Sequence, residues 1–349
     1  MKALSIHAAK DLRLEEHPDP TAGPGEVLVR LEAGGICGSD LHYFNHGGFG
    51  TVRLREPMIL GHEVAGRVEA LGDGVRGLEV GQRVAVSPSR PCGTCTFCQT
   101  GAQNHCLNMR FYGSAMPFPH IQGAFRQLLV ADASQCVPTT LSAGEAAMAE
   151  PLSVVLHAAK QAGSLAGKRV LVTGCGPIGL LSVLVAKTAG ALEIVATDIA
   201  AFTLQKAQSV GAHRVFNVAD TPDALAPYGA DKGQFDVLFE CSGVAAALAS
   251  AVPAMRPGGT IVQLGLGGDM TLPVQAMTAK ELTLRGSFRF HHEFALAVEA
   301  MQRGQIDVRP LITETHPMDN ALTAFEKAGD RTSAIKVQIA FADAPAASP

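Results

Sequence analysis

The sequence has no tryptophan, and aromatic residues of every kind make up only 5% of its 349 positions. A surface that stacks nucleic-acid bases needs such side chains, so their scarcity argues against one. An excess of one charge is also missing, because 28 Lys and Arg residues stand against 32 Asp and Glu residues, for a formal net charge of −4. A protein that binds a phosphate backbone clusters its basic residues. We therefore expect no nucleic-acid partner.

The sequence also lacks a long uninterrupted hydrophobic run. Its most apolar stretch, residues 170–186, is interrupted by three glycines and Pro177. The stretch is shorter than the ~20 residues that a helix needs to cross a bilayer. The first residues mix charged and apolar side chains and match neither a signal peptide nor a transit peptide. We therefore expect a cytoplasmic protein that does not bind membranes.

Hydrophobic residues are plentiful, at 47% of the chain. A chain of this composition can bury a large core, and its length suggests about two domains. Short strand-like runs separated by turns rich in glycine and proline occupy residues 27–31, 64–70, 83–86 and 125–130. This pattern predicts an irregular, barrel-like β domain at the start of the chain.

Strand-like and helix-like segments alternate from about residue 165 onward. Strand patterns occupy 169–172, 193–197, 235–239 and 260–264, and helix patterns occupy 178–189, 204–210 and 244–255. Repeated βαβ units predict an α/β fold with a doubly wound parallel sheet covered by helices. We assign this domain to residues 146–290. A helix at 294–301 and a strand at 334–341 are expected to complete the first domain, so that it comprises 1–145 and about 291–349.

Four cysteines are crowded into one short loop, as Cys92, Cys95, Cys98 and Cys106. In a reducing compartment such crowding indicates a metal site more than disulfides. Four thiolates match the tetrahedral coordination of Zn²⁺ in structural sites. An iron–sulfur cluster or free thiols are the alternatives, but nothing around the loop favours redox chemistry. We expect a structural zinc ion here.

The glycines of a Gly174-x-Gly176-x-x-Gly179 motif lie between a predicted strand and a predicted helix. Gly174 permits the tight turn, Gly176 lets the backbone approach a pyrophosphate, and Gly179 allows close packing of helix and strand. The helix begins with Pro177 and Ile178, and its N-terminus offers N–H groups to phosphates. This segment predicts a dinucleotide site.

Asp198 ends the next predicted strand. A carboxylate there binds the ribose hydroxyls of NAD and repels the 2′-phosphate of NADP. We expect NAD as the cofactor, with NADP disfavoured. A solvated aspartate after an ordinary strand–turn–helix unit is the alternative.

A second group of metal-ligand types lies in loops rich in glycine: Cys37, His62, Glu63 and Glu150. A mixed set of thiolate, imidazole and carboxylate with one vacant position is typical of catalytic zinc. Each residue also has an ordinary interpretation, as a core thiol, a loop histidine, a surface acid or a helix-capping acid. Spacing alone does not unite them.

Together these segments resemble the zinc-dependent medium-chain dehydrogenases over nearly the whole chain. The resemblance is carried by residues 35–42, 61–66, 92–106, 150–154 and 174–179. It implies a GroES-like catalytic domain, a Rossmann domain that binds NAD, a substrate cleft between them, two zinc ions per chain and a homo-tetramer or homo-dimer.

A glutamate at position 150 resembles the polyol dehydrogenase branch of this family. That branch implies Cys37, His62 and Glu63 as ligands of the catalytic zinc, with Glu150 close to the metal or its water. Whether Glu63 or Glu150 supplies the third ligand stays open. The resemblance further implies that Ser39 and His42 relay a proton to solvent, and it places Tyr43 on the substrate side. For His42 an ordinary surface histidine is the alternative.

Segments 108–125, 134–138 and 285–290 resemble the branch that interconverts the sugar acid L-idonate and 5-keto-D-gluconate. A carboxylate substrate suits a bidentate guanidinium, and Arg110 and Arg289 lie in these segments. Polyol dehydrogenases also carry an arginine at the position of Arg289, so Arg110 is the residue expected to discriminate. Ordinary surface pairing is the alternative for both.

The expected function is therefore the oxidation of a secondary alcohol of a sugar acid with zinc and NAD. The first alternative is the same chemistry on a neutral polyol such as sorbitol. The second is a catalytically silent NAD-binding protein, which metal analysis would distinguish because it would hold one zinc ion rather than two.

Overall fold

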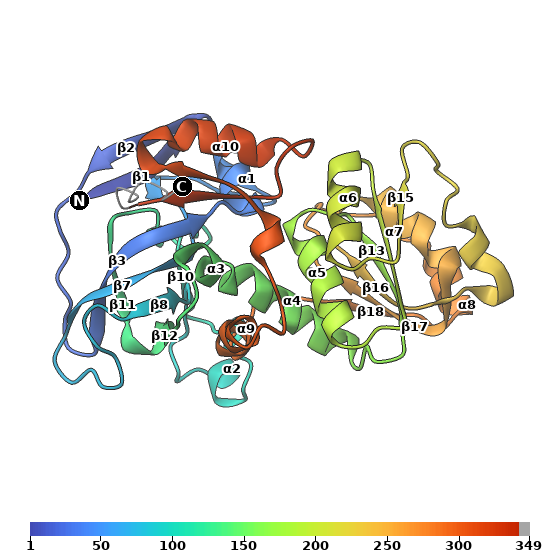
Figure 1. Ribbon diagram of the computed structural model, residues 1–349, viewed down its shortest axis with the longest axis horizontal. Coiled ribbons are helices and arrows are strands. Elements are labelled where there is room, and N and C mark those ends of the chain that lie inside the picture. The colour runs from blue at the N-terminus through green and yellow to red at the C-terminus, as the bar shows by residue number, and fades with distance from the viewer. Residues whose placement is uncertain (342–349) are drawn as a thin grey trace.

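The computed structural model describes residues 1–341; residues 342–349, the end of the predicted 291–349 segment, lie outside the described part of the chain. Two bodies lie side by side along the long axis, a mainly β body that contains the N-terminus and an α/β body (Figure 1). Within residues 1–341, we find no helix with the length and apolar character needed to cross a membrane.

The β body is built around a mixed seven-stranded sheet of order β12-β8-β7-β3-β20-β19, with β11 also paired to β3. Its strands are β3 (Glu26–Gly35), β7 (Glu63–Leu71), β8 (Arg83–Val86), β11 (Leu128–Asp132), β12 (Cys136–Pro138), β19 (Ile312–Pro317) and β20 (Lys336–Ala340). Because β20 pairs antiparallel with β3, the last part of the described chain returns to the first body.

Smaller sheets and helices complete this body. The strands are β1 (Lys2–Ala8), β2 (Asp11–Glu16), β4 (Gly48–Phe49), β5 (Val52–Arg53), β6 (Met58–Ile59), β9 (Ser89–Arg90) and β10 (Arg110–Phe111). The helices are α1 (Gly38–His46), α2 (Thr96–Gln99), α3 (Ala143–Ala147) and α10 (Ala321–Gly329).

The α/β body holds a six-stranded parallel sheet of order β15-β14-β13-β16-β17-β18, which confirms the predicted fold class. The strands are β13 (Arg169–Thr173), β14 (Glu193–Asp198), β15 (Arg214–Asn217), β16 (Phe235–Glu240), β17 (Met255–Gln263) and β18 (Thr283–Gly286). The helices of this body are α4 (Ala149–Ala162), α5 (Pro177–Thr188), α6 (Ala201–Val210), α7 (Ala245–Ala251) and α8 (Val274–Ala279), and α9 (Glu293–Gln302) packs against α4.

Side chains of the parallel strands alternate between two cores, as the period of two in a strand requires. Val170 and Val172 pack into a core with residues of α4, α5, α6 and α9. Leu171 lies in a separate core with residues of α7 and the turns around it. Both faces of the sheet are therefore covered at its centre, which explains why the central strands β13, β14 and β16 are largely apolar.

Two sequence expectations about element limits were wrong. The helix predicted at 244–255 ends at Ala251, because a 3₁₀ turn containing Pro253 follows and β17 begins at Met255. The strand predicted at 125–130 begins instead at Leu128. The N–H of Phe125 donates to the carbonyl of Leu60 outside that strand, at 2.8 Å.

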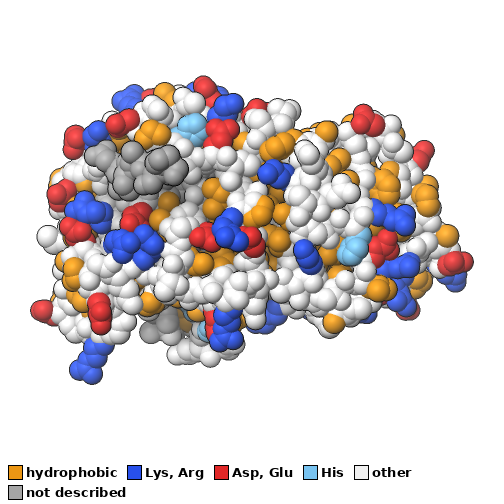
Figure 2. All heavy atoms as spheres, viewed as in Figure 1, with side chains coloured by type: hydrophobic (Ala, Val, Ile, Leu, Met, Phe, Trp, Pro, Cys, Tyr) orange, Lys and Arg blue, Asp and Glu red, His pale blue; other side chains and the backbone are white. Residues whose placement is uncertain are grey.

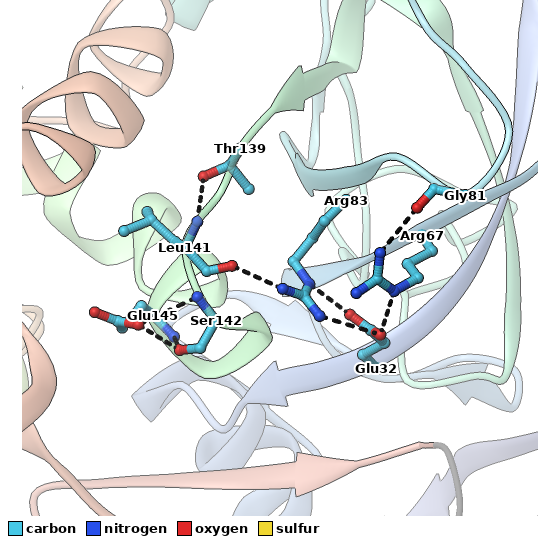
Figure 3. Close-up of polar contacts among 8 residues, drawn as sticks. All are labelled: Glu32, Arg67, Gly81, Arg83, Thr139, Leu141, Ser142 and Glu145. Carbon is cyan, nitrogen blue, oxygen red and sulfur yellow. Dashed lines mark hydrogen bonds and ion pairs between the residues drawn. The ribbon is translucent and has the colours of Figure 1, made fainter.

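A polar network ties the seven-stranded sheet to the segment that leads into α4 (Figure 3). The Glu32 carboxylate accepts from Arg67 Nε at 3.0 Å and from Arg83 Nε at 2.8 Å. Arg83 Nη1 also donates to the carbonyl of Leu141 at 3.0 Å. Ser142 and Glu145 then form a capping box at the start of α3. The entry to α4 is thus fixed to the sheet.

The face drawn in Figure 2 carries Lys and Arg side chains interspersed with Asp and Glu side chains over both bodies. This distribution agrees with the nearly balanced counts of the two charges in the sequence.

Candidate active site

Cys37, His62 and Glu63 converge at one end of the seven-stranded sheet. The register of β3 and β7 sets Gly35 opposite Glu63, and Cys37 follows β3 directly as the N-cap of α1. The ligand atoms of the three residues lie within 4.8 Å of one another. The pairing of two strands therefore brings together side chains that are 25 positions or more apart in the sequence.

Asp40 connects the two loops that carry these residues. Its buried carboxylate accepts from the Cys37 N–H at 3.0 Å and from the Gly61 N–H at 3.1 Å. The same carboxylate lies 3.8 Å from Nδ1 of His62. Sequence reasoning missed Asp40, although an acid three residues after an N-cap is a recognisable capping pattern.

The donor set fits a zinc ion. Nδ1 of His62 is buried and has no hydrogen-bond partner among residues 1–341, and a buried polar atom in that state is costly unless something binds nearby. Burial raises the pKa of the Cys37 thiol to about 11, and a metal ion reverses such a shift by binding the thiolate. Thiolate, imidazole and carboxylate together are ligands that zinc takes in catalytic sites.

Lys336 pairs with Glu63 inside this site. Its Nζ donates to Oε1 and Oε2 of Glu63 at 2.8 and 2.7 Å and to the carbonyl of Ile36 at 3.1 Å. Burial lowers the pKa of Lys336, but the charges of Glu63, Cys37 and Glu150 together with the hydrogen bond to Glu63 outweigh burial, and the net shift is upward. The only sequence evidence for Lys336 is a lysine among the mainly apolar residues of the predicted strand 334–341.

Glu150 lies in the first turn of α4, buried, and outside the group of three ligand atoms. Burial raises its pKa to about 8, and the charges of His62, Glu63 and Cys37 act on it. The structure thus places Glu150 beside the three-residue cluster and Glu63 within it.

Arg289 reaches the same region from the loop after β18. Its guanidinium carbon lies 4.3 Å from the centroid of the Phe111 ring, and that ring lies 5.7 Å from the ring of His62. Burial lowers the pKa of Arg289, with Glu150 and Tyr43 among the charges that act on it. A φ of +54° at Arg289 is unusual for a residue with a side chain.

Tyr43 is buried, and its hydroxyl oxygen accepts from the Ala115 N–H at 3.0 Å. Arg110 is exposed in β10, next to Phe111. Because neighbouring residues of a strand point to opposite faces, Arg110 faces away from the side on which Phe111 meets His62. The structure therefore brings Arg289, and not Arg110, to the cluster.

Ser39 and His42 lie three positions apart on α1 and so share one helix face. Ser39 is among the groups that act on the Cys37 thiol, whose pKa it lowers slightly against the raising effect of burial. Burial lowers the pKa of His42, and the charges of His46 and Arg331 lower it further. His42 is therefore neutral near pH 7 and able to accept a proton.

The glycine motif forms the turn between β13 and α5. Gly174 has a φ of +83°, and a Cβ at Gly179 would lie 1.8 Å from the carbonyl oxygen of Gly174, so neither position tolerates a side chain. Pro177 and Ile178 open α5, whose first turn holds no acidic residue.

Asp198 ends β14, beside the glycine turn. Its carboxylate accepts from the backbone N–H groups of Cys175, Ile199 and Ala200, at 2.5, 2.7 and 3.0 Å. The acid is thereby held next to the turn.

The four-cysteine loop gathers its sulfur atoms within 4.8 Å of one another. The loop also contacts the α/β body, because Asn104 Nδ2 donates to the carbonyl of Phe288 at 3.0 Å. The ring of His105 stacks on Phe288 with 6.0 Å between centroids. The tetrahedral thiol set fits a structural zinc ion.

A parallel dinucleotide-type sheet joined to a β body that carries two such ligand clusters defines a zinc-dependent medium-chain dehydrogenase, and the chain belongs to this family. Residues 23–141 match the alcohol dehydrogenase GroES-like domain, and residues 177–303 match the zinc-binding dehydrogenase domain.

Individual relatives narrow the comparison. The chain is 44% identical over 318 residues to L-idonate 5-dehydrogenase (NAD(P)(+)) of Escherichia coli K12, covering 90% of this chain and 92% of the relative. It is 40% identical over 330 residues to sorbitol dehydrogenase of Gallus gallus, covering 93% and 92%. The crystal structure of the E. coli L-idonate 5-dehydrogenase superposes with a TM-score of 0.93 at 42% identity, over 97% of this chain and 98% of that one.

Proposed function

We propose that this protein transfers a hydride between the C5 alcohol of L-idonate and NAD(P), forming 5-keto-D-gluconate. The observation that carries the proposal is the convergence of Cys37, His62 and Glu63 in one region with the half-buried side chain of Arg289. The 44% identity to an enzyme of that name supports the choice of substrate.

Cys37, His62 and Glu63 would hold the catalytic zinc ion, with Glu150 next to it. When bound, zinc acts as a Lewis acid on the substrate oxygen and lowers the pKa of the alcohol. The hydroxyl proton would leave through Ser39 to His42, which is free to accept it because its pKa is depressed. Asp40 would keep the two ligand loops in register.

Arg289 would bind the carboxylate of the sugar acid through paired charge-assisted hydrogen bonds. Its placement beside Glu150 and Tyr43 supports this role. That Arg110 discriminates acidic from neutral substrates stays a prediction. Because Arg110 is exposed in β10, Arg289 is the stronger candidate for binding the substrate carboxylate.

The glycine motif with Pro177 and Ile178 would bind the pyrophosphate of the cofactor, and Asp198 its adenosine ribose. When bound, the cofactor would supply the nicotinamide that accepts the hydride from the substrate carbon. We keep the preference for NAD as a proposal, because the E. coli relative is named for both cofactors.

We further propose a structural zinc ion on Cys92, Cys95, Cys98 and Cys106, a cytoplasmic location and a homo-dimer or homo-tetramer. The exposed edge strand β18 offers one surface for assembly. The proposed domain limits remain 1–145 with 291–349 for the catalytic domain and 146–290 for the cofactor domain, and the pairing of β20 with β3 supports that division.

A direct test offers L-idonate and sorbitol as hydride donors, each with NAD and with NADP, to protein whose zinc content has been measured. We expect two zinc ions per chain and the highest kcat/KM with L-idonate. Preference for sorbitol would instead favour the neutral polyol function. The 40% identity to sorbitol dehydrogenase supports that alternative. Absence of turnover with one zinc ion per chain would favour the silent cofactor-binding protein.

A further inference from the structure

The side chain of Arg331 lies over the glycine turn of the other body. Arg331 follows α10, in the segment that leads into β20. A Cβ built on Gly176 would lie 2.8 Å from Nη1 of Arg331 and 3.9 Å from its Cζ. The guanidinium therefore lies against the backbone of Gly176, which no side chain covers. Gly176 and Arg331 are 155 positions apart in the sequence.

The neighbouring acid does not neutralise this arginine. The Asp330 carboxylate accepts from the N–H and hydroxyl of Thr332 at 3.0 and 2.5 Å and from the hydroxyl of Ser333 at 2.6 Å. The Asp330 carboxylate is thus used in hydrogen bonds within its own turn, residues 330–333. Among residues 1–341 no carboxylate lies within 4.0 Å of the Arg331 guanidinium, which is exposed.

Two positive groups consequently face each other, and among residues 1–341 no carboxylate pairs with the guanidinium; the acid beside the turn, Asp198, binds the Cys175 N–H. The N-terminus of α5, twelve residues long, has Gly176 as its N-cap, no side-chain cap and no acid in its first turn. Its N–H groups carry about half a positive charge. A guanidinium opposite such a terminus is favourable only when an anion lies between them.

Arg331 also acts on the β body, since its charge is among those that lower the pKa of His42 on α1. The guanidinium therefore lies close to residues of both bodies, the glycine turn of one and the proton-relay helix of the other.

We propose that Arg331 binds the cofactor pyrophosphate from the side opposite the glycine turn, so that the anion is held by both bodies at once. The proposal rests on the proposed function, because it assigns a residue to the same cofactor. The backbone N–H groups of α5 bind one side of the diphosphate and the guanidinium binds the other. Bound cofactor thereby links the segment before β20 to the α/β body.

The test compares Arg331→Ala with the unaltered, zinc-loaded protein in titrations with NADH, followed by the fluorescence of the nicotinamide. ADP-ribose and adenosine serve as competitors, since only the first carries the pyrophosphate. We expect about tenfold weaker binding of NADH and ADP-ribose, which corresponds to about 1.4 kcal/mol. We expect less than a twofold change for adenosine.

Two further variants serve as controls. Arg331→Lys keeps a point charge but loses the bidentate fork, so its affinity for ADP-ribose is expected between those of the other two proteins. Arg13→Ala removes the same charge from an exposed arginine of β2 that pairs with Asp11, and is expected to bind all three ligands normally.

The outcomes are distinguishable. Equal affinity of Arg331→Ala and the unaltered protein for ADP-ribose overturns this inference and leaves the proposed function standing. An equal loss for adenosine overturns it as well, because the effect would then be structural. Failure of the unaltered protein to bind NADH or ADP-ribose overturns the proposed function and this inference together.

Discussion

The buried pair of Lys336 and Glu63 gives the sharpest prediction about stability. Their side chains are only 2% and 1% exposed, so replacing Lys336 by methionine leaves the Glu63 carboxylate buried without its counter-charge. Removing one partner of a buried ion pair costs about 3–5 kcal/mol. At roughly 2 °C per kcal/mol for a chain of this size, the midpoint of thermal unfolding should fall by about 6–10 °C.

Zinc should change the size of this loss. Because a divalent cation beside Glu63 supplies the positive charge that the lysine provided, Lys336→Met should lose less stability when the open site is loaded. The double variant Lys336→Met/Glu63→Gln should recover much of the loss, since it removes the unpaired charge.

Scanning calorimetry of each variant, with chelator and with zinc, measures these differences against the unaltered protein under the same condition. The reasoning is refuted if the chelator-treated Lys336→Met protein unfolds at the temperature of the unaltered protein. An identical loss with and without zinc would show that Glu63 does not face the metal.

Three other predictions concern the site and its support. Cys37→Ser should abolish turnover and remove one of two zinc ions, while NADH binding persists; wild-type activity in this variant would show that the open-site assignment is wrong. Arg289→Ala should raise KM for L-idonate at least tenfold, because a charge-assisted hydrogen bond contributes about 1.5–3 kcal/mol; a larger effect from Arg110→Ala, confined to the acid substrate, would reverse the assignment of the two arginines. Hydrogen bonds from His157 and the backbone outweigh burial and hold the pKa of Glu293 at about 2, so its carboxylate stabilises the fold above its ordinary pKa of about 4.5 and loses that effect as the pH falls toward 2. Unfolding midpoints of Glu293→Gln measured at pH 7 and pH 3 should therefore differ less than those of the unaltered protein, and equal differences would contradict the prediction.

The periodic parts of the fold were accessible from the sequence. The buried strands β13, β14 and β16 are apolar on both faces, and each was predicted within one or two residues of its limits. The edge strand β18 was missed, because its four residues are exposed and show no apolar alternation. Strand β15 was missed for a similar reason, being half-buried along most of its length.

Site residues could be predicted from the sequence where they are distinctive metal-ligand types. They could not be predicted where their partners are set by tertiary contacts. Cysteines, a histidine and glutamates in glycine-rich loops pointed to the metal clusters. Asp40 and Lys336 carry no such chemistry in sequence, because what matters is the strand pairing that brings Asp40 to the Gly61 N–H and Lys336 to Glu63. The choice between Arg110 and Arg289 likewise depends on which face of a short strand meets His62.

The contact between the four-cysteine loop and Phe288 links two parts of the molecule that are usually considered separately. Arg289 follows Phe288 with a positive φ, and Asn104 and His105 bind Phe288 from within that loop. A metal ion held by the four-cysteine loop would therefore help to position Arg289, the group proposed to bind the substrate carboxylate. Substitutions in the four-cysteine loop would then change substrate preference without replacing a ligand of the catalytic metal. Evolution could change the preferred sugar by that route.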